Sequence, residues 1–454
     1  MTANAPRDVD VADVIDKAPF NSFLFLISLC LFLTLYFDGL DFGLLGYMVP
    51  VIGEDLGASR FEVGLAIAVG PIGGALGGII GGFFGDRLGR RNSLFASVAL
   101  FSLATVAFAS SANMEILILT RFVSTLGLGA ATPNVAALLA ELIPRRLRSQ
   151  IMGAAFVGFP LGTATNGLLI PLLLPVYGWR GVALTGAVLP LLLLAFLFWI
   201  VPESPRFLSG KRNSAGRIAK LLGRLRPDMA FSERDRFVLT EQRVAKAGVR
   251  ALLTREYWRD TLGLWALGFS NQFASISIAS WGATALTTIG FSYMVVVRGL
   301  MVSQLCGAAA ALAGGWLMGR IGSRTSLRIF SVFGAMVALM LFAFASSPAD
   351  WGMNRDLLLI LGLAMVGLSL SGVQLGEYPL AANAYPTNVR ASGVGWMVGV
   401  ARTGAISAAT ITGLIVNGFG AQYIFVGVAL AFVIGWVALT AITRHVPKAY
   451  PLRD

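Results

Sequence analysis

Long apolar stretches follow one another along almost the whole of this 454-residue chain. An α-helix needs roughly 20 apolar residues to cross the hydrocarbon core of a bilayer. Hydrophobic residues make up 56% of the chain and charged residues only 13%, against roughly a quarter charged in a soluble domain. We identify twelve stretches of the required length, at residues 22–48, 60–84, 92–111, 116–141, 149–172, 179–201, 260–289, 293–319, 325–347, 356–384, 391–417 and 421–443. The sequence therefore predicts an integral membrane protein.

A basic turn after the second span recurs after the eighth. Residues 82–91 read GFFGDRLGRR, and residues 315–324 read GWLMGRIGSR. A proline with an arginine four residues later also occurs twice, after the fourth and the tenth spans. The paired positions are Arg87 with Arg320, Arg91 with Arg324, Pro144 with Pro386 and Arg148 with Arg390. Two echoes in the same order indicate two homologous halves.

The fold class that follows is an all-α membrane protein with twelve transmembrane helices in two pseudo-symmetric six-helix bundles. The expected segments are an N-terminal segment 1–21, a first bundle 22–201, a charged linker 202–259, a second bundle 260–443 and a tail 444–454. The periodicity of the linker, as in residues 234–249, allows one or two amphipathic surface helices.

Basic residues gather in the turns on one side of the predicted membrane. The net charge is +12, but short basic turns between apolar spans set topology rather than bind nucleic acid. The opposite turns carry Glu54, Asp55, Glu115 and Asp350 and few cations. The positive-inside rule therefore places both termini and the linker in the cytoplasm.

Residues suited to catalysis or metal binding are scarce. Cys30 and Cys306 lie in separate apolar stretches, and the single histidine, His445, lies in the tail. An enzyme would need a nucleophile with a base, or a metal cluster, and a sensor would need a signalling domain longer than the linker. We therefore expect no enzyme, no metal and no cofactor.

Two carboxylates lie in the first span. Asp38 and Asp41 are three residues apart and share a helix face near mid-membrane. Burial disfavours the charged form of a carboxyl, which brings proton loading within physiological reach. Proton coupling by either one is therefore expected; the alternative is a structural salt bridge to an arginine. Arg121, in the fourth span, is the expected partner of one of them.

Arg402, in the eleventh span, is the candidate for binding an anionic substrate. A guanidinium stays charged and forms a bidentate fork with a carboxylate. Internal pairing with Glu377 of the tenth span is the open alternative. Neutral side chains that would orient a substrate, or else join helices, are Asn134, Asn271, Gln272 and Gln304. Aromatic side chains that would line a ring-shaped pocket are Tyr36, Phe42, Trp281 and Trp396.

Several motifs resemble those of the major facilitator superfamily over nearly the whole chain. They are the GFFGDRLGRR turn and the run PESPRFL at 202–208 after the sixth span. Within it, the sequence resembles the aromatic acid:proton symporter family, which includes 4-hydroxybenzoate and protocatechuate carriers. The matching residues are DGLD at 38–41, Arg121 with Phe122, GLGAATPN at 127–134 before Glu141, and Arg390 before Trp396 and Arg402.

The resemblance implies a gate on the cytoplasmic side and a role for the acidic pair in proton coupling. Asp86 resembles the acid that holds this side closed, although Gly319 stands in its place in the second half. The remaining expected gate residues are Arg87, Arg90, Arg91, Glu141, Arg148, Arg320 and Arg390.

The expected function is import of an aromatic carboxylate, hydroxybenzoate-like, by proton symport through alternating access. The partners would be this substrate, protons and the lipid bilayer, and the protein would work as a monomer in the bacterial inner membrane. A proton-driven exporter of drugs or aromatic compounds on the same fold is the alternative.

Overall fold

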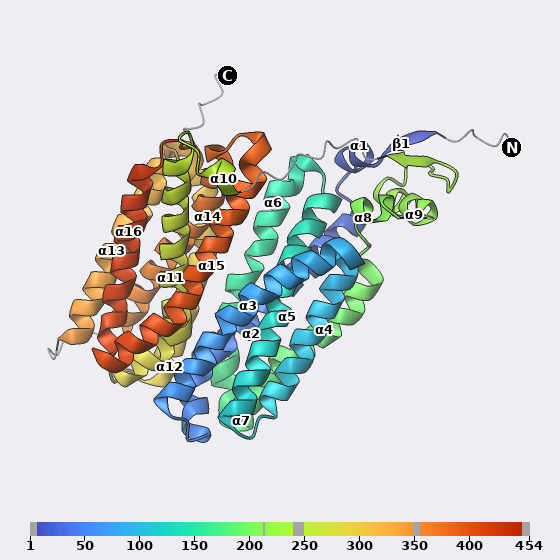
Figure 1. The fold of residues 1–454 in the computed structure, drawn as a ribbon. Helices are drawn as coiled ribbons and strands as arrows, with labels where there is room; N and C mark the ends of the chain where they lie inside the picture. The colour runs from blue at the N-terminus through green and yellow to red at the C-terminus, as the bar shows by residue number, and fades with distance from the viewer. Residues whose placement is uncertain (1–6, 212–213, 239–248, 348–354, 447–454) are drawn as a thin grey trace.

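The computed structural model describes residues 7–211, 214–238, 249–347 and 355–446 (Figure 1). Long helices make up two bundles that lie side by side, one from each half of the chain. Helices α2 and α7 pack along each other in the first bundle, and α11 packs against α15 and α16 in the second.

The first bundle contains six helical elements. They are α2 (Ser22–Asp55), α3 (Arg60–Leu88), α4 (Arg90–Ala109), α5 (Met114–Leu142), α6 (Arg145–Phe156) and α7 (Gly158–Ile200). The 43-residue α7 consists of two helices that meet at Gly178, whose φ of 63° and ψ of −177° are not helical. A positive φ is readily accessible only to glycine. The fifth and sixth predicted spans therefore both extend as helix to Gly178, and no six-residue loop separates them.

The second bundle repeats this plan. It consists of α11 (Trp258–Thr288), α12 (Tyr293–Ile321), α13 (Ser323–Ser346), α14 (Arg355–Ala384), α15 (Thr387–Gly418), the 3-10 turn η1 (Ala421–Tyr423) and α16 (Ile424–Ala441). Ten segments of the described chain are long and apolar enough to cross a membrane. One of them, Arg145–Ile200, contains two predicted spans, and α11 has the length but several polar residues. The twelve-helix prediction is confirmed.

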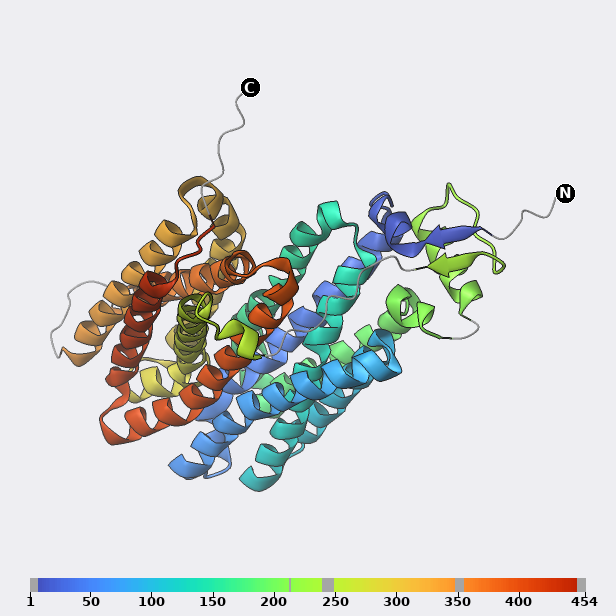
Figure 2. The same ribbon diagram turned by 45° about the horizontal axis from the view of Figure 1, so that its top comes forward.

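The start of the chain and the linker fold together beside the first bundle (Figure 2). Strand β1 (Asp8–Asp10) pairs in parallel with β2 (Arg236–Val238). Helix α1 (Val11–Asp16) packs on α9 (Ala215–Leu225), and Arg145 of α6 forms an ion pair with Asp16. Short helices α8 (Pro205–Ser209) and α10 (Val249–Leu252) complete the linker.

The linker contains an amphipathic helix, as its periodicity allowed. This helix is α9, whose buried residues include Ile218, Leu222 and Leu225. Of the range 234–249, the structure describes residues 234–238 and Val249. Within that range Arg236–Val238 form a strand, because β1 supplies a partner that is distant in sequence. Residues 239–248 lie outside the described part of the chain.

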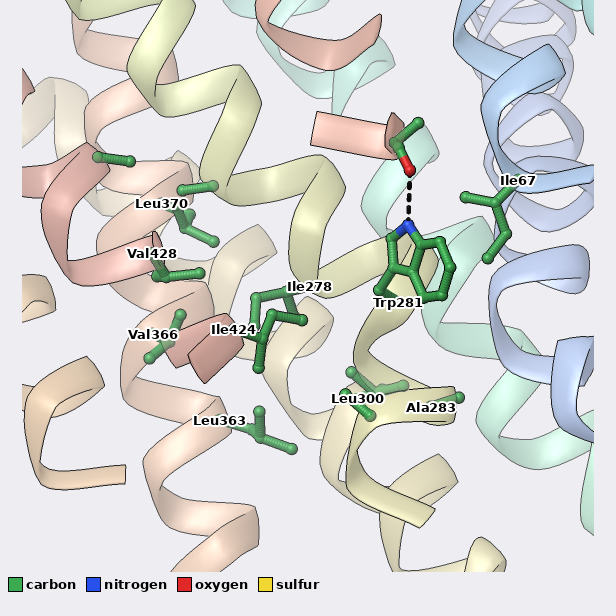
Figure 3. Close-up of a cluster of buried hydrophobic side chains, with 14 of the residues drawn as sticks. Ile67, Ile278, Trp281, Ala283, Leu300, Leu363, Val366, Leu370, Ile424 and Val428 are labelled. Atoms are coloured by element: carbon green, nitrogen blue, oxygen red, sulfur yellow. Dashed lines mark hydrogen bonds between the residues drawn. The ribbon is translucent and has the colours of Figure 1, made fainter. Parts of the chain in front are cut away.

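The two bundles meet mainly at the end of the molecule opposite the chain ends. A side chain at Gly46 of α2 would overlap the backbone of Ala279 in α11, and the hydroxyl of Tyr293 donates to the carbonyl oxygen of Tyr47 over 3.0 Å. Figure 3 shows Trp281 of the second bundle beside Ile67 of the first. At the other end, which holds both chain ends and the basic turns, the bundles diverge (Figure 1).

Candidate functional site

A cavity of about 390 Å³ lies between the bundles. Helices α2, α3, α5 and α7 form one wall, and α11, α12, α14 and α15 form the other. Among the described residues, Asp38 and Arg402 are the only charged side chains that line it. Each comes from a different bundle. The cavity therefore presents one acid and one base to a ligand in otherwise neutral surroundings.

Asp38 is held at the cavity wall by its neighbours on α5 and α7. Its side chain is buried, and Thr132 donates its hydroxyl hydrogen to Oδ2 over 3.2 Å. The next residue, Gly39, lets α2 approach the backbone of Phe159 more closely than any side chain would allow. Thr163 joins the same helices by donating to the carbonyl oxygen of Gly39 over 2.9 Å. Asp38 thus has one neutral donor and faces the cavity.

Asp41 is fully buried and lies outside the cavity lining. Nη1 of Arg121 contacts Asp41 Oδ2 at 2.8 Å, and the hydroxyl of Thr105 donates to Oδ1 at 2.8 Å. Arg121 also donates to the carbonyl oxygens of Asp41 and Phe42. An ion pair with this many hydrogen bonds satisfies most of the polar atoms that burial removes from water. The predicted partner of Arg121 is therefore Asp41, and not Asp38.

Arg402 reaches across from α15 to the first bundle. Its Nη1 donates to the carbonyl oxygens of Gly74 and Ala75, each over 3.2 Å. A side chain at Gly78 would overlap the guanidinium, so glycine at this position of α3 makes room for it. Arg402 and Asp38 line the same cavity from opposite bundles. Backbone carbonyls satisfy only part of a guanidinium's five donors, which leaves the remainder for a bound anion.

Glu377 and Asn271 are buried in the second bundle behind the cavity wall. In the described part of the chain, Glu377 Oε2 has no hydrogen-bonding partner and no ion pair joins this residue to Arg402. Asn271 lines a separate small cavity with Ser331 and Phe432, and neither of its amide atoms is bonded. The expected contact of either residue with a substrate in the main cavity is not present in this conformation.

Comparison with known proteins identifies the fold and the family. The profile of the Major Facilitator Superfamily matches residues 31–375. The chain belongs to this superfamily. A gallate transporter of Pseudomonas putida is 34% identical to it over 421 residues, which cover 92% of this chain and 91% of that protein. A 4-hydroxybenzoate transporter of Pseudomonas aeruginosa is 33% identical and covers 90% of this chain and 89% of its own.

Solved structures support the same fold. The crystal structure of a D-xylose–proton symporter superposes with a TM-score of 0.71, and it covers 94% of this chain and 99% of that one. Sequence identity to it is 17%. The protein is therefore a multi-pass transporter of the major facilitator superfamily, related to carriers of aromatic acids, and not an enzyme.

The other predicted substrate residues of the transporter divide into two groups. Phe42, Gln272 and Gln304 line the cavity. Four do not. Tyr36 bonds Thr165 over 2.7 Å, and Trp281 is buried and donates to the carbonyl oxygen of Ala409 over 2.9 Å. Asn134 is buried and donates to the carbonyl oxygens of Gly81 and Ala130 and to Ser93, and Trp396 is 45% exposed beside Trp265.

The predicted gate residues of the transporter lie at the basic end, where the bundles diverge. Asp86 pairs with Arg90 one helical turn on, at 2.5 Å, so its bond lies within its own turn. Arg91 ties this turn to the end of α7 through the carbonyl oxygens of Phe198 and Val201. Arg87 lies over the ring of Phe83, and Glu141 accepts a hydrogen bond from Ser204. Arg148 donates to the carbonyl oxygen of Ile143, and Arg390 donates to the carbonyl oxygen of Tyr385. Arg320 lies in the last turn of α12.

Sequence reasoning missed several polar residues of the cavity wall. Ser275, Ser303, Ser371 and Gln374 all line it. On α14, Ser371, Gln374 and Tyr378 are spaced by three and four residues, which is the spacing of one helix face. That spacing was visible in the sequence, but serine is common in membrane helices and bonds to the backbone of its own helix, so the signal was weak.

Proposed function

We propose that this transporter imports an aromatic carboxylate together with one or more protons. The observation that carries the proposal is the cavity between the bundles, whose only described charges are Asp38 and Arg402 from opposite bundles. The names of the two relatives, a gallate and a 4-hydroxybenzoate transporter, support the aromatic acid. Because Arg402 faces a buried acid, a substrate carboxylate can take the place of that acid as the counter-ion of the guanidinium.

The substrate would bind with its carboxylate at Arg402. The guanidinium presents donors in a planar fork that matches two carboxylate oxygens. The ring would lie against Phe42 and Phe159, whose centroids are 5.5 Å apart on the opposite wall. Aromatic rings prefer offset or edge-to-face contacts at such separations. The second bundle would thus bind the carboxylate of the substrate and the first bundle its ring, so that a bound substrate would connect the two bundles.

Asp38 would carry the proton. When Asp38 is ionised its charge offsets that of Arg402, and a second carboxylate in the cavity would be repelled. Protonation of Asp38 removes that repulsion and leaves Arg402 available for the substrate. Linkage requires the reverse as well, so that a bound carboxylate favours the protonated form of Asp38. Asp41, already paired with Arg121, would hold α2 and α5 in place.

We place the protein in a bacterial inner membrane with both termini and the basic turns in the cytoplasm. The positive-inside rule supports this orientation, and both relatives are bacterial. The cavity of the conformation described here would then face the cytoplasm, with the bundles closed toward the outside. We propose that the turn at Asp86 and Arg90 takes part in closing the cytoplasmic side in the opposite conformation.

The test is uptake of labelled aromatic acids into proteoliposomes, with and without an inward proton gradient. We expect one or more acids to accumulate only with the gradient, and a protonophore to abolish the accumulation. Equal uptake under both conditions would show a carrier without proton coupling. If no aromatic acid is transported and lipophilic drugs move outward in a proton-driven manner, the proposal of an importer is wrong and the protein is an exporter.

A further inference from the structure

We propose that the second bundle's wall of the cavity is the subsite that binds the ring hydroxyl groups of the transported acid. This inference rests on the proposed function. The neutral hydrogen-bonding side chains of this wall that line the cavity include Gln272, Ser275, Ser303, Gln304, Ser371 and Gln374. They come from α11, α12 and α14, which converge there.

The serines of this wall differ in their hydrogen bonding from other serines of the same helices. Within the described chain Ser275, Ser303 and Ser371 make no hydrogen bond to another residue. Serines of the same helices that point elsewhere behave differently: Ser277 donates to the carbonyl oxygen of Phe273 over 2.8 Å, and Ser369 to that of Met365 over 2.9 Å. That bond is the usual way a helix satisfies a buried serine. The hydroxyl groups that face the cavity are therefore available to a ligand.

The amides also have bonding capacity to spare. Gln374 donates from Nε2 to Gln272 Oε1 over 3.4 Å, a long bond that links α14 to α11. A primary amide offers two donors and an acceptor with two lone pairs, so each glutamine keeps free groups. Gln304 has no partner in the described chain. A phenolic hydroxyl, which both donates and accepts, is matched to such a pair.

Close packing of α12 and α14 fixes the positions of the two serines. A side chain at Gly367 would overlap Ser303, and one at Gly307 would overlap Ser371. Glycine at both positions lets the two helices approach until each serine lies against the other helix. A rigid wall of this kind holds hydrogen-bonding groups at defined positions, and this is the condition for discriminating between similar ligands.

The subsite and Arg402 lie on the neighbouring helices α14 and α15 of the same cavity wall. Ser371, Gln374 and Tyr378 follow one another along one face of α14 and all line the cavity. Seven residues of helix rise by about 10 Å, so this row of side chains extends along the cavity. When the carboxylate is bound at Arg402, we expect the far edge of the ring to lie within reach of this row.

The first bundle's wall has fewer neutral groups that could bind a ring hydroxyl. The hydroxyl groups of Thr125 and Thr132 are donated within the protein, and in the described chain that of Tyr47 is buried without a partner. Phe42, Phe159 and Pro160 also line this wall, and the hydroxyl of Thr163 is already donated to the carbonyl oxygen of Gly39. A ring would thus pack on the first bundle and direct its hydroxyl groups to the second. A site built to bond a substrate hydroxyl rejects the analogue that lacks it, because the site's polar groups then lose their partners.

The experiment compares proteoliposome uptake of benzoate, 4-hydroxybenzoate, 3,4-dihydroxybenzoate and 3,4,5-trihydroxybenzoate by the full-length wild-type protein. We expect kcat/KM to be at least about tenfold higher for a hydroxylated acid than for benzoate. In Gln374→Leu and Ser371→Ala this ratio is expected to fall about five- to tenfold. Ser369→Ala, on the same helix but bonded to its own backbone, is the matched control and should keep the ratio.

The outcomes separate the two proposals. Transport of no aromatic acid would reject the proposed function. Transport of benzoate as efficiently as its hydroxylated analogues would leave that function in place and overturn the subsite. An unchanged ratio in both Gln374→Leu and Ser371→Ala would also overturn it. If either variant fails to fold, Gln272→Leu repeats the measurement on the other member of the glutamine pair.

Discussion

Asp38 and Asp41 lie one helical turn apart but have different surroundings. Asp41 is paired with Arg121 and bonded by Thr105, whereas Asp38 faces the cavity and accepts from Thr132. In Asp38→Asn the side chain stays neutral at every pH. We expect gradient-driven accumulation to be lost, while exchange of internal for external substrate continues, because exchange requires no net proton movement. Uphill uptake and counterflow in proteoliposomes measure the two separately.

Asp41→Asn is the contrasting variant. It leaves the buried Arg121 without its counter-charge, and breaking a buried pair in this way destabilises a protein by about 3 to 5 kcal/mol. We expect a lower yield of folded protein and a lower melting temperature, with uphill uptake and counterflow reduced together. Normal uphill uptake by Asp38→Asn would contradict our assignment of the proton carrier. Lost accumulation with normal counterflow in Asp41→Asn would transfer that role to Asp41.

Arg402 is the residue at which charge and geometry can be separated. In Arg402→Lys the positive charge remains, but a single ammonium replaces the planar fork that matches a carboxylate. We expect KM for the substrate to rise about tenfold, which corresponds to about 1.4 kcal/mol. An ammonium also fills less of the space that Gly78 leaves open. Unchanged KM would show that Arg402 only joins α15 to the carbonyls of α3.

At the scale of elements, the glycines of α3 determine how closely it packs on α5. Side chains at Gly77 or Gly81 would overlap the backbone of α5 at Leu126 or Ala130. Gly77→Ala is therefore expected to destabilise the first bundle by about 1 to 3 kcal/mol, the usual cost of overpacking. Thermal unfolding in detergent, followed by fluorescence-detected size exclusion, measures this as a lower melting temperature.

Gly82→Ala is the matched control on the same helix. No atom lies within 4 Å of a methyl group placed there, and alanine is the better helix former by about 1 kcal/mol. We expect an unchanged or slightly higher melting temperature. Equal loss of stability in both variants would mean that helix flexibility, and not close packing, explains the glycines of α3.

The predictable part of the fold depended on composition and repetition. Apolar length identified the transmembrane helices, and the repeated basic turns indicated the two bundles. The pairing of β1 with β2 could not be predicted, because each strand has three residues and its partner lies more than 200 positions away. Short strands carry little periodicity of their own.

Site residues could be predicted where ionisable side chains are rare. Asp38 and Arg402 were notable because few charges occur inside the spans, and both line the cavity. Asn134, Asn271 and Trp281 were equally conspicuous, yet they face helix contacts and not the cavity. Hydropathy gives the depth of a residue in the membrane but not the direction in which it points, because that depends on how neighbouring helices pack.

At the scale of the whole molecule, the contact between the bundles at one end determines which end is open. Tyr47 meets Tyr293 and Gly46 meets Ala279 at the end opposite the basic turns. Gly167 of α7 likewise leaves room for Met301 of α12. Alternating access moves one repeat against the other around a central site. If this transporter works in that way, we expect these contacts to separate once in every transport cycle.

A bulky side chain at Gly46 would act as a wedge in this contact. In Gly46→Leu the added atoms would overlap the carbonyl oxygen of Ala279, so the bundles could no longer close at this end. We expect transport to be lost while substrate still binds from the outside.

Spin labels at Phe61→Cys and Phe419→Cys, in a background with Cys30 and Cys306 replaced, report the separation of exposed residues on α3 and after α15. Their distance distribution should lengthen in Gly46→Leu and stay unchanged in Gly418→Leu, where no atom lies within 4 Å. Full transport activity in Gly46→Leu with an unchanged distance distribution would contradict this prediction. It would show that the bundles accommodate the larger side chain and that this contact does not control access.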